Sequence, residues 1–216
     1  MNICIIGDGL TGLSLAKNLI NKKINVHMYY EHKIKNLSSS RTIGISKSNF
    51  NFFKKEIYNI SKKNFWEINR IEIYSEKLKN QKLLEFENNQ QNLFYLVKNY
   101  ELCKSLKKEI SKNKYYKAKL IKKNFYEDLL RKNKYDLIIN CLSNNYLSKK
   151  YFTKKINKNY NNLAYTTILE HKKVKNNTAV QTFTRFGPIA FLPMSKTETS
   201  VVCSLDTKKK IFNNKD

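Results

Sequence analysis

The sequence predicts an α/β fold, in which a parallel sheet comes first and a mixed or antiparallel sheet follows. Residues 2–6 form a short apolar run that is typical of a buried parallel strand, and residues 24–30 form a second one. Between these two runs, apolar residues recur at helical spacing. From residue 163 onwards, short apolar segments alternate with polar turns, which is the pattern of antiparallel strands.

The two predicted parallel strands are linked by a complete G-x-G-x-x-G sequence that starts at residue 7. In this setting the first glycine permits a tight turn, the second lets a pyrophosphate approach the backbone, and the third packs the helix closely on the sheet. The N–H groups at the start of the helix attract phosphate, and an acid at the end of the second strand accepts hydrogen bonds from a ribose. The residues predicted to bind a dinucleotide are Gly7, Gly9, Leu10, Thr11, Gly12 and Glu31.

The alternative interpretation is a glycine-rich turn in a parallel sheet that binds no ligand. Asp8 supports this alternative, because a carboxylate beside a pyrophosphate is unfavourable unless it points away. The complete strand–turn–helix–strand context favours dinucleotide binding and a Rossmann-like parallel sheet.

Composition limits the class of protein. A length of 216 residues with 41% hydrophobic residues is enough for one large domain or two small ones. No apolar run approaches the ~20 residues that span a bilayer, and the first residues lack the basic region of a signal peptide, so we expect a cytoplasmic protein. The net charge of +25 raises the alternative of a basic nucleic-acid or membrane-surface binder. Because the lysines are scattered, we expect no specific nucleic acid partner, and only peripheral binding at the inner face of a membrane.

The cysteines and histidines show no pattern of a metal or catalytic site. The four cysteines are far apart without a C-x-x-C pair, so we expect reduced thiols. The three histidines have no metal-ligand spacing, and we expect no metal site. No Ser/His/Asp arrangement stands out and no catalytic residue is assigned, so any chemistry is expected to belong to a cofactor.

Further elements follow from the apolar pattern. We expect helices over residues 48–60 and 101–110, and strands over residues 68–74, 82–86, 93–97 and 135–141. The strand over 135–141 should return to the parallel sheet, and those over 68–74 and 82–86 should pair. The antiparallel strands are expected over residues 164–169, 178–183, 189–194 and 200–205.

Four segments, in order, resemble the FAD-dependent aromatic hydroxylases similar to para-hydroxybenzoate hydroxylase, and most closely the ubiquinone-biosynthesis branch. The first is the glycine turn with its acid. The second is Arg41-Thr42 with the residues up to Ser48, which resembles the arginine segment near the flavin. The third is Leu96–Asn99, and the fourth, residues 183–194, resembles the glycine-proline-x-alanine-x-x-proline segment of the substrate domain. The resemblance implies FAD contacts at Arg41 and Asn99, and a wall beside the flavin made of Gly187, Pro188 and Pro193.

The resemblance also implies a domain division and a reaction. A Rossmann-like FAD-binding domain would comprise residues 1–64 and 93–150, and an incomplete substrate-domain sheet residues 65–92 and 151–216. The reaction would be hydroxylation of a phenolic, ubiquinone-precursor-like ring with O₂ and NAD(P)H. The implied partners are a small aromatic or prenylated phenol and peripheral association with a membrane or a ubiquinone-biosynthesis complex.

The sequence departs from the family in two places. Leu142-Ser143 stands where the family has an Asp-Gly pair that contacts FAD and NAD(P)H, which counts against NAD(P)H as reductant. The family also continues to a Gly-Asp motif beyond the length of this chain, so we expect a C-terminally truncated form that covers about half of a family member. The alternative function is therefore a catalytically inactive nucleotide- or partner-binding remnant.

Overall fold

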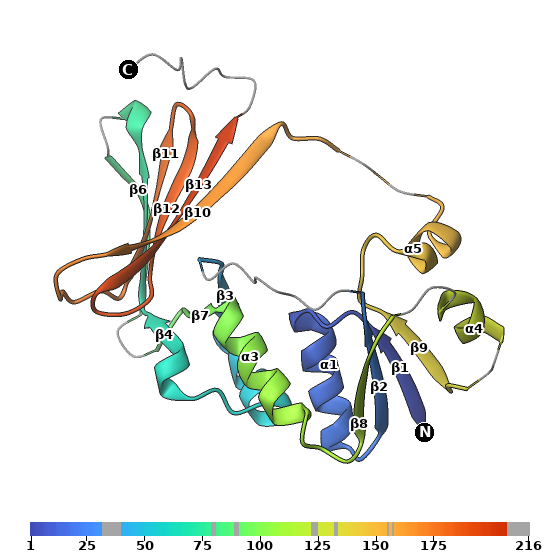
Figure 1. Ribbon diagram of the computed structural model, residues 1–216. Helices are drawn as coiled ribbons and strands as arrows, with labels where there is room; N and C mark the ends of the chain where they lie inside the picture. Colours follow the sequence, from blue (N-terminus) through green and yellow to red (C-terminus); the bar gives the residue numbers. More distant parts are fainter. Residues whose placement is uncertain are drawn as a thin grey trace. The chain divides into compact units, whose positions relative to one another are not determined.

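The computed structural model describes residues 1–31, 40–78, 81–88, 91–121, 125–131, 134–154, 156 and 158–206. Its contacts divide the chain into two units (Figure 1). The first unit comprises Met1–Leu37, Phe52–Asn59 and Tyr100–Ile156, and the second comprises Ser38–Asn51, Ile60–Asn99 and Asn157–Asp216. Compared with the boundaries expected from the sequence, this division places residues 38–51, 60–64 and 93–99 in the second unit and residues 151–156 in the first. The strands within 38–51 and 93–99 pair with each other.

A four-stranded parallel sheet forms the centre of the first unit. Its order is β8-β2-β1-β9, and all three pairings are parallel, as predicted for the Rossmann-like part. The apolar pattern of the sequence did not predict β8. Its lysines alternate with Tyr116, Ala118 and Leu120, so it lacks the continuous apolar run of a buried parallel strand and has the pattern of an edge strand. The strands are β1 (Asn2–Ile6), β2 (Asn25–Tyr30), β8 (Tyr116–Leu120) and β9 (Leu137–Asn140).

Helices cover both faces of the parallel sheet (Figure 1). Ile5 faces α1, since its Cγ2 lies 3.6 Å from the position of a Cβ added to Gly12. Cys4 and Ile6 point to the other face, where they pack with residues of α4 and α5. A π-helical turn, η1, is held to α1 by hydrogen bonds from two asparagine side chains. The helices are α1 (Leu10–Asn21), η1 (Phe53–Ile57), α3 (Asn99–Ile110), α4 (Phe125–Arg131) and α5 (Tyr146–Tyr151).

The second unit contains a six-stranded sheet of order β10-β13-β12-β11-β5-β6. All pairings are antiparallel except β11 with β5. The four antiparallel strands after residue 163 and the pairing of β5 with β6 confirm the sequence prediction. The strands are β5 (Arg70–Ser75), β6 (Gln81–Glu87), β10 (Asn162–Glu170), β11 (Thr178–Thr184), β12 (Gly187–Pro193) and β13 (Glu198–Asp206).

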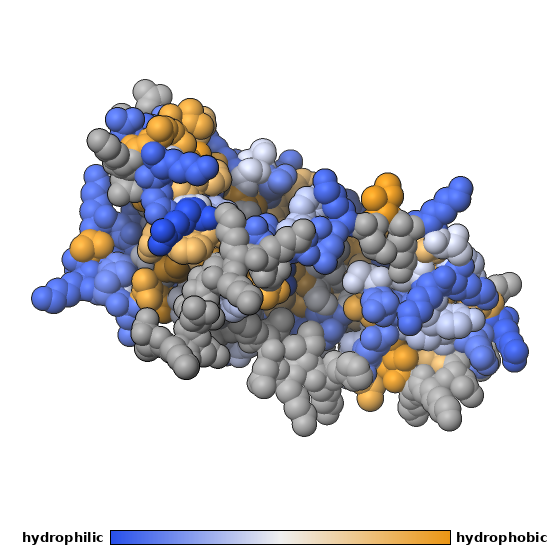
Figure 2. All heavy atoms as spheres, turned by 90° about the horizontal axis from the view of Figure 1, so that it is seen from above, coloured by the Kyte–Doolittle hydropathy of each residue, from blue (hydrophilic) through white to orange (hydrophobic). Residues whose placement is uncertain are grey.

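A three-stranded antiparallel sheet, β3-β7-β4, packs on one face of the six-stranded sheet. Ile68 and Leu96 of the smaller sheet form a buried cluster with Ala179 and Met194. On the opposite face, Leu169 and Phe191 are exposed, and Figure 2 shows hydrophobic side chains at the surface of this strand-rich unit. The remaining elements are β3 (Thr42–Ser46), α2 (Lys47–Phe52), η2 (Lys62–Asn64), β4 (Phe65–Ile68), η3 (Glu76–Leu78) and β7 (Phe94–Lys98).

Besides β8, the elements expected over residues 68–74 and 48–60 differ from the sequence prediction. The single strand expected over residues 68–74 is divided between β4 and β5, because the chain leaves the smaller sheet at Asn69, whose N–H donates to the Asn177 carbonyl. The helix expected over residues 48–60 is α-helical only to Phe52 and continues as a π-helical turn to Ile57. Apolar periodicity does not show where a strand leaves one sheet for another. It also does not distinguish an α-helix from a π-helical turn, because apolar residues recur at similar spacing in both.

A polar cluster lies between β2 and the start of β9. The Tyr135 hydroxyl lies 2.9 Å from Nδ1 of His27 and 2.7 Å from the Tyr29 hydroxyl. Burial lowers the pKa of His27, and the nearby lysines Lys134 and Lys117 lower it further. Burial likewise raises the pKa of Tyr135, so both groups are neutral in the fold near pH 7.

The lowered pKa of His27 predicts a pH dependence of stability. As the pH falls below about 6.5, the unfolded chain binds a proton at this histidine before the folded chain does. The free energy of unfolding should therefore fall between about pH 7 and pH 5, and His27→Phe should reduce that slope. Urea unfolding of both proteins across this pH range tests the prediction, and identical slopes would contradict it.

Candidate functional site

The turn between β1 and α1 has a backbone that requires glycine at its start. Gly7 has a φ of +109°, in the region that side chains rarely adopt. Its N–H donates to the Tyr29 carbonyl at 2.7 Å, which fixes the turn to β2. A Cβ at Gly7 would also meet the Leu142 side chain at 3.0 Å.

The other two glycines of the turn have contrasting surroundings. Gly9 is the N-cap of α1 and is exposed, and no atom of the described residues lies within 4 Å of an added Cβ. An added Cβ at Gly12 would lie 2.1 Å from the Gly7 carbonyl oxygen, so the helix and the turn are in direct contact. Leu10 and Thr11 begin the helix with no side-chain cap, and the first N–H groups of a helix have no partner within the helix. An exposed backbone at a helix N-terminus fits a phosphate group.

Glu31 lies directly after β2, the strand beside β1. Its Oε1 accepts a hydrogen bond from the Tyr126 hydroxyl at 2.9 Å. Burial, and then this bond to a carboxylate, raise the pKa of Tyr126 to about 12. Tyr126 comes from α4, and no sequence pattern connects it with the acid, so sequence reasoning missed it.

A hydrogen-bond network fixes the chain after β9, where Leu142 packs beside the glycine turn. Asn140 Nδ2 donates to the Leu142 carbonyl at 3.0 Å and to Ser148 Oγ at 2.9 Å. Asn145 caps α5, because its Oδ1 accepts from the Ser148 N–H at 2.9 Å. Leu142-Ser143, the departure noted in the sequence, therefore lies at the same edge of the sheet as Gly7.

The Asp8 side chain is paired with a lysine of α3. Its Oδ2 lies 2.8 Å from Nζ of Lys107 on α3. The Asp8 carboxylate, which would be unfavourable beside a pyrophosphate, is thus paired with a cation from α3, a helix that lies mainly in the same unit.

The structure brings Arg41 and Asn99 together in the second unit. The pairing of β3 with β7 places Thr42 opposite Lys98, and the Asn99 N–H donates to the Arg41 carbonyl at 3.0 Å. Arg41 is exposed, whereas Asn99 is 6% exposed. The two positions that the resemblance identified separately are therefore neighbours.

The segment predicted as a wall lies on β12. Gly187 has a φ of +139°, and an added Cβ would lie 1.9 Å from the Ser204 carbonyl oxygen, so only glycine fits. Pro188 and Pro193 point to opposite faces of the strand, because they are an odd number of residues apart in a regular ladder. The two prolines therefore lie on different faces of the six-stranded sheet.

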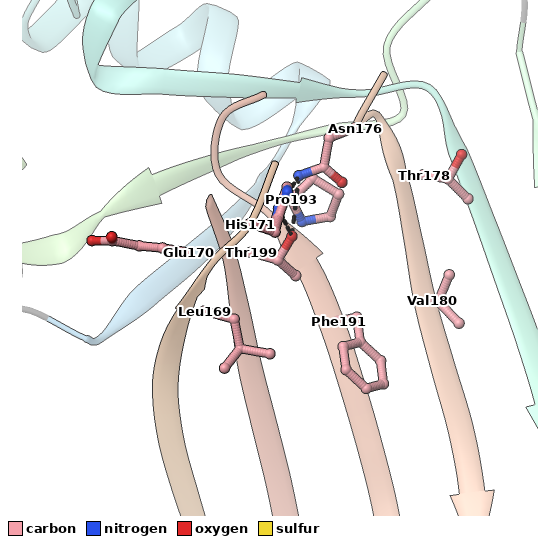
Figure 3. A pocket seen from close by; sticks show the side chains of 9 residues that line it. All are labelled: Leu169, Glu170, His171, Asn176, Thr178, Val180, Phe191, Pro193 and Thr199. Atoms are coloured by element: carbon pink, nitrogen blue, oxygen red, sulfur yellow. Dashed lines mark hydrogen bonds between the residues drawn. The ribbon is translucent and has the colours of Figure 1, made fainter. Parts of the chain in front are cut away.

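Pro193 lines a cavity of about 390 Å³ on the face that the smaller sheet leaves uncovered (Figure 3). Its polar end is internally hydrogen-bonded: His171 Nε2 lies 3.0 Å from Thr199 Oγ1, and Asn176 Nδ2 donates to the Ser195 carbonyl at 2.8 Å. The rest of the lining is mainly apolar, with Leu169, Val180 and Phe191 among its residues.

Within the described ranges, no cluster of three or more His, Cys, Asp or Glu residues could hold a metal ion. None of the helices in those ranges is long and apolar enough to cross a membrane.

Solved structures share this fold. PqsL, described as a probable FAD-dependent monooxygenase from Pseudomonas aeruginosa, aligns with a TM-score of 0.72 at 10% identity over 97% of this chain and 61% of its own. HpxO from Klebsiella pneumoniae, solved with FAD and uric acid, aligns with a TM-score of 0.69 at 12% identity over 95% of this chain and 56% of its own. No protein-family model and no curated protein matches the sequence.

The chain therefore has the fold of FAD-dependent monooxygenases, and it spans about six tenths of the length of these solved proteins. PqsL has also been solved with 2-aminobenzoylacetate, at a TM-score of 0.74 and 9% identity over 97% of this chain and 62% of PqsL. The identities are low, so the likeness is one of fold.

The network after β9 predicts a specific loss of stability. Asn145→Ala removes the cap of α5 and two hydrogen bonds with Asn140, and should lower the free energy of unfolding by about 1–2 kcal/mol. Asn144→Ala, at the exposed neighbouring position, should change it by less than about 0.5 kcal/mol. Urea unfolding compares the two variants, and equal losses would contradict the role of the network.

Proposed function

We propose that this chain binds FAD through its β1–α1 turn and takes part in flavin-dependent hydroxylation of a small aromatic ring. The observation that carries the proposal is the turn at Gly9: α1 has no side-chain cap there, and no atom of the described residues lies within 4 Å of a Cβ added at Gly9. An uncapped helix N-terminus after a glycine turn fits a pyrophosphate such as that of FAD. The likeness in fold to PqsL, described as a probable FAD-dependent monooxygenase, supports FAD as the ligand.

The adenosine half of FAD would use the first unit. The N–H groups of Leu10 and Thr11 would bind the pyrophosphate, while Gly9 and Gly12 keep the backbone accessible. Glu31 would accept hydrogen bonds from the ribose hydroxyls, and the Tyr126 hydroxyl would hold its carboxylate in place.

The residues proposed to contact the flavin ring lie close together within the second unit. Arg41 and the buried Asn99 are neighbours, which supports a shared role beside the flavin. Pro188 is on the face of β12 that packs towards the smaller sheet, and β3 of that sheet follows Arg41 directly, so we assign the wall beside the flavin to Gly187 and Pro188. Pro193 would instead line the cavity on the other face.

The substrate we propose is a phenolic ring, of the ubiquinone-precursor type that residues 183–194 resemble. HpxO with uric acid and PqsL with 2-aminobenzoylacetate support a small ring compound. Bound FAD would supply the activation of O₂. One oxygen atom would enter the ring and the other would leave as water, with two electrons from NAD(P)H. Peripheral association with a membrane, favoured by the net charge of +25, is part of the same proposal.

FAD binding is tested by a variant of the glycine turn and a control on α3. Gly9→Ala should keep the thermal midpoint, because its φ of −71° suits alanine and none of the described residues has an atom within 4 Å of its Cβ. It should lower FAD affinity at least about tenfold, because the new methyl group fills the space through which the phosphate approaches. Lys108→Ala, at an exposed position of α3, should bind like the wild type. Titration of flavin fluorescence measures both, and a wild-type chain that binds no FAD would refute the proposal.

Turnover is tested separately from binding. The FAD-loaded chain, supplied with NADPH or NADH, O₂ and a short-chain prenylphenol, should form a hydroxylated product that incorporates one ¹⁸O atom from ¹⁸O₂. FAD binding without any product would contradict the hydroxylase and favour the alternative, a nucleotide-binding protein without catalysis. Leu142-Ser143 supports that alternative, since no carboxylate stands at that position.

A further inference from the structure

We propose that Lys107 is a positioning residue of the phosphate site, which holds the Asp8 carboxylate out of the glycine turn and neutralises its charge. The inference rests on the proposed binding of FAD. It assigns a role to Lys107 of α3, a helix that is not part of the β1–α1 glycine turn.

The geometry places a carboxylate inside the phosphate-binding sequence. Asp8 stands between Gly7 and Gly9, immediately before the N-cap of α1. Its side chain is 16% exposed, and its Oδ2 lies 2.8 Å from Nζ of Lys107, whose side chain is 39% exposed. The pair is therefore partly shielded from water, and its charges interact more strongly than an exposed pair would.

The position of Lys107 is fixed by the packing of α3. Leu106 and Ile110 are fully buried, which sets the rotation of the helix and directs Lys107 to the glycine turn. A second ion pair, Lys17 with Glu109 at 3.5 Å, also joins α1 to α3. The direction of the Asp8 side chain is thus determined by a helix about 100 residues away in the sequence.

A released Asp8 carboxylate would act against a bound phosphate in two ways. The N-terminus of α1 attracts anions, and an adjacent carboxylate can accept hydrogen bonds from the same N–H groups. Where it does not compete directly, it repels the phosphates across a few ångströms of partly shielded space. Lys107 removes both effects, since it fixes the carboxylate on the α3 side and cancels its charge.

The test is a double-mutant cycle read out as the FAD dissociation constant. Lys107→Met should weaken binding about tenfold or more at low salt, and the difference should shrink at high salt as the charges are screened. Adding Asp8→Asn to Lys107→Met should restore binding to within about threefold of the wild type, because the repelling charge is gone. Lys107→Arg, which keeps the cation, should bind like the wild type.

Lys108→Met is the matched control, since it removes one positive charge from an exposed position of the same helix and should change binding less than about twofold. The inference is overturned if Lys107→Met binds FAD as the wild type does, or if Asp8→Asn fails to restore the Lys107→Met protein. Failure of the wild type itself to bind FAD is a distinct outcome, which removes the proposed function and with it this role of Lys107.

Discussion

The contact between Gly12 and the Gly7 carbonyl is the constraint on which the first unit depends. An added Cβ at Gly12 would lie 2.1 Å from that oxygen, so α1 can reach the end of β1 only if this residue has no side chain. The close approach directs the helix N-terminus to the carboxyl edge of the parallel sheet, where open α/β sheets bind ligands. Glu31 and Leu142 reach the same edge, because their strands flank β1 in a parallel arrangement.

The Asp8 carboxylate at the glycine turn is neutralised by a neighbouring lysine, within a chain that is strongly basic as a whole. The protein carries 42 Lys and Arg against 17 Asp and Glu, so a carboxylate at the phosphate site could be expected to matter little. The distance between charges is more important than their number, because salt screens exposed charges that are more than about 10 Å apart. Partly buried charges that are close together are screened much less. The pair of Asp8 with Lys107 is therefore more relevant to an anionic ligand than the overall charge.

In the second unit, residues that are consecutive in a sequence motif lie on different faces of the sheet. Residues 187–193 form one strand, and the sequence places both of the chain's prolines in it. The pleat sends Pro188 and Pro193 to opposite faces, one towards the smaller sheet and one into the cavity of Figure 3. Conversely, β3 and β7 are far apart in the sequence, yet their pairing makes Arg41 and Asn99 neighbours.

The sequence by itself determined the elements whose signals are local: the strand, glycine turn, helix and strand up to Glu31, and the antiparallel strands after residue 163. These were readable because backbone conformation at a glycine and apolar periodicity depend on a few consecutive residues. Only the tertiary structure decided which distant groups meet there. The edge strand β8, the bond from Tyr126 to Glu31, the network that fixes Leu142, and the pairing of Lys107 with Asp8 all join residues that packing brings together, and no local pattern records such contacts.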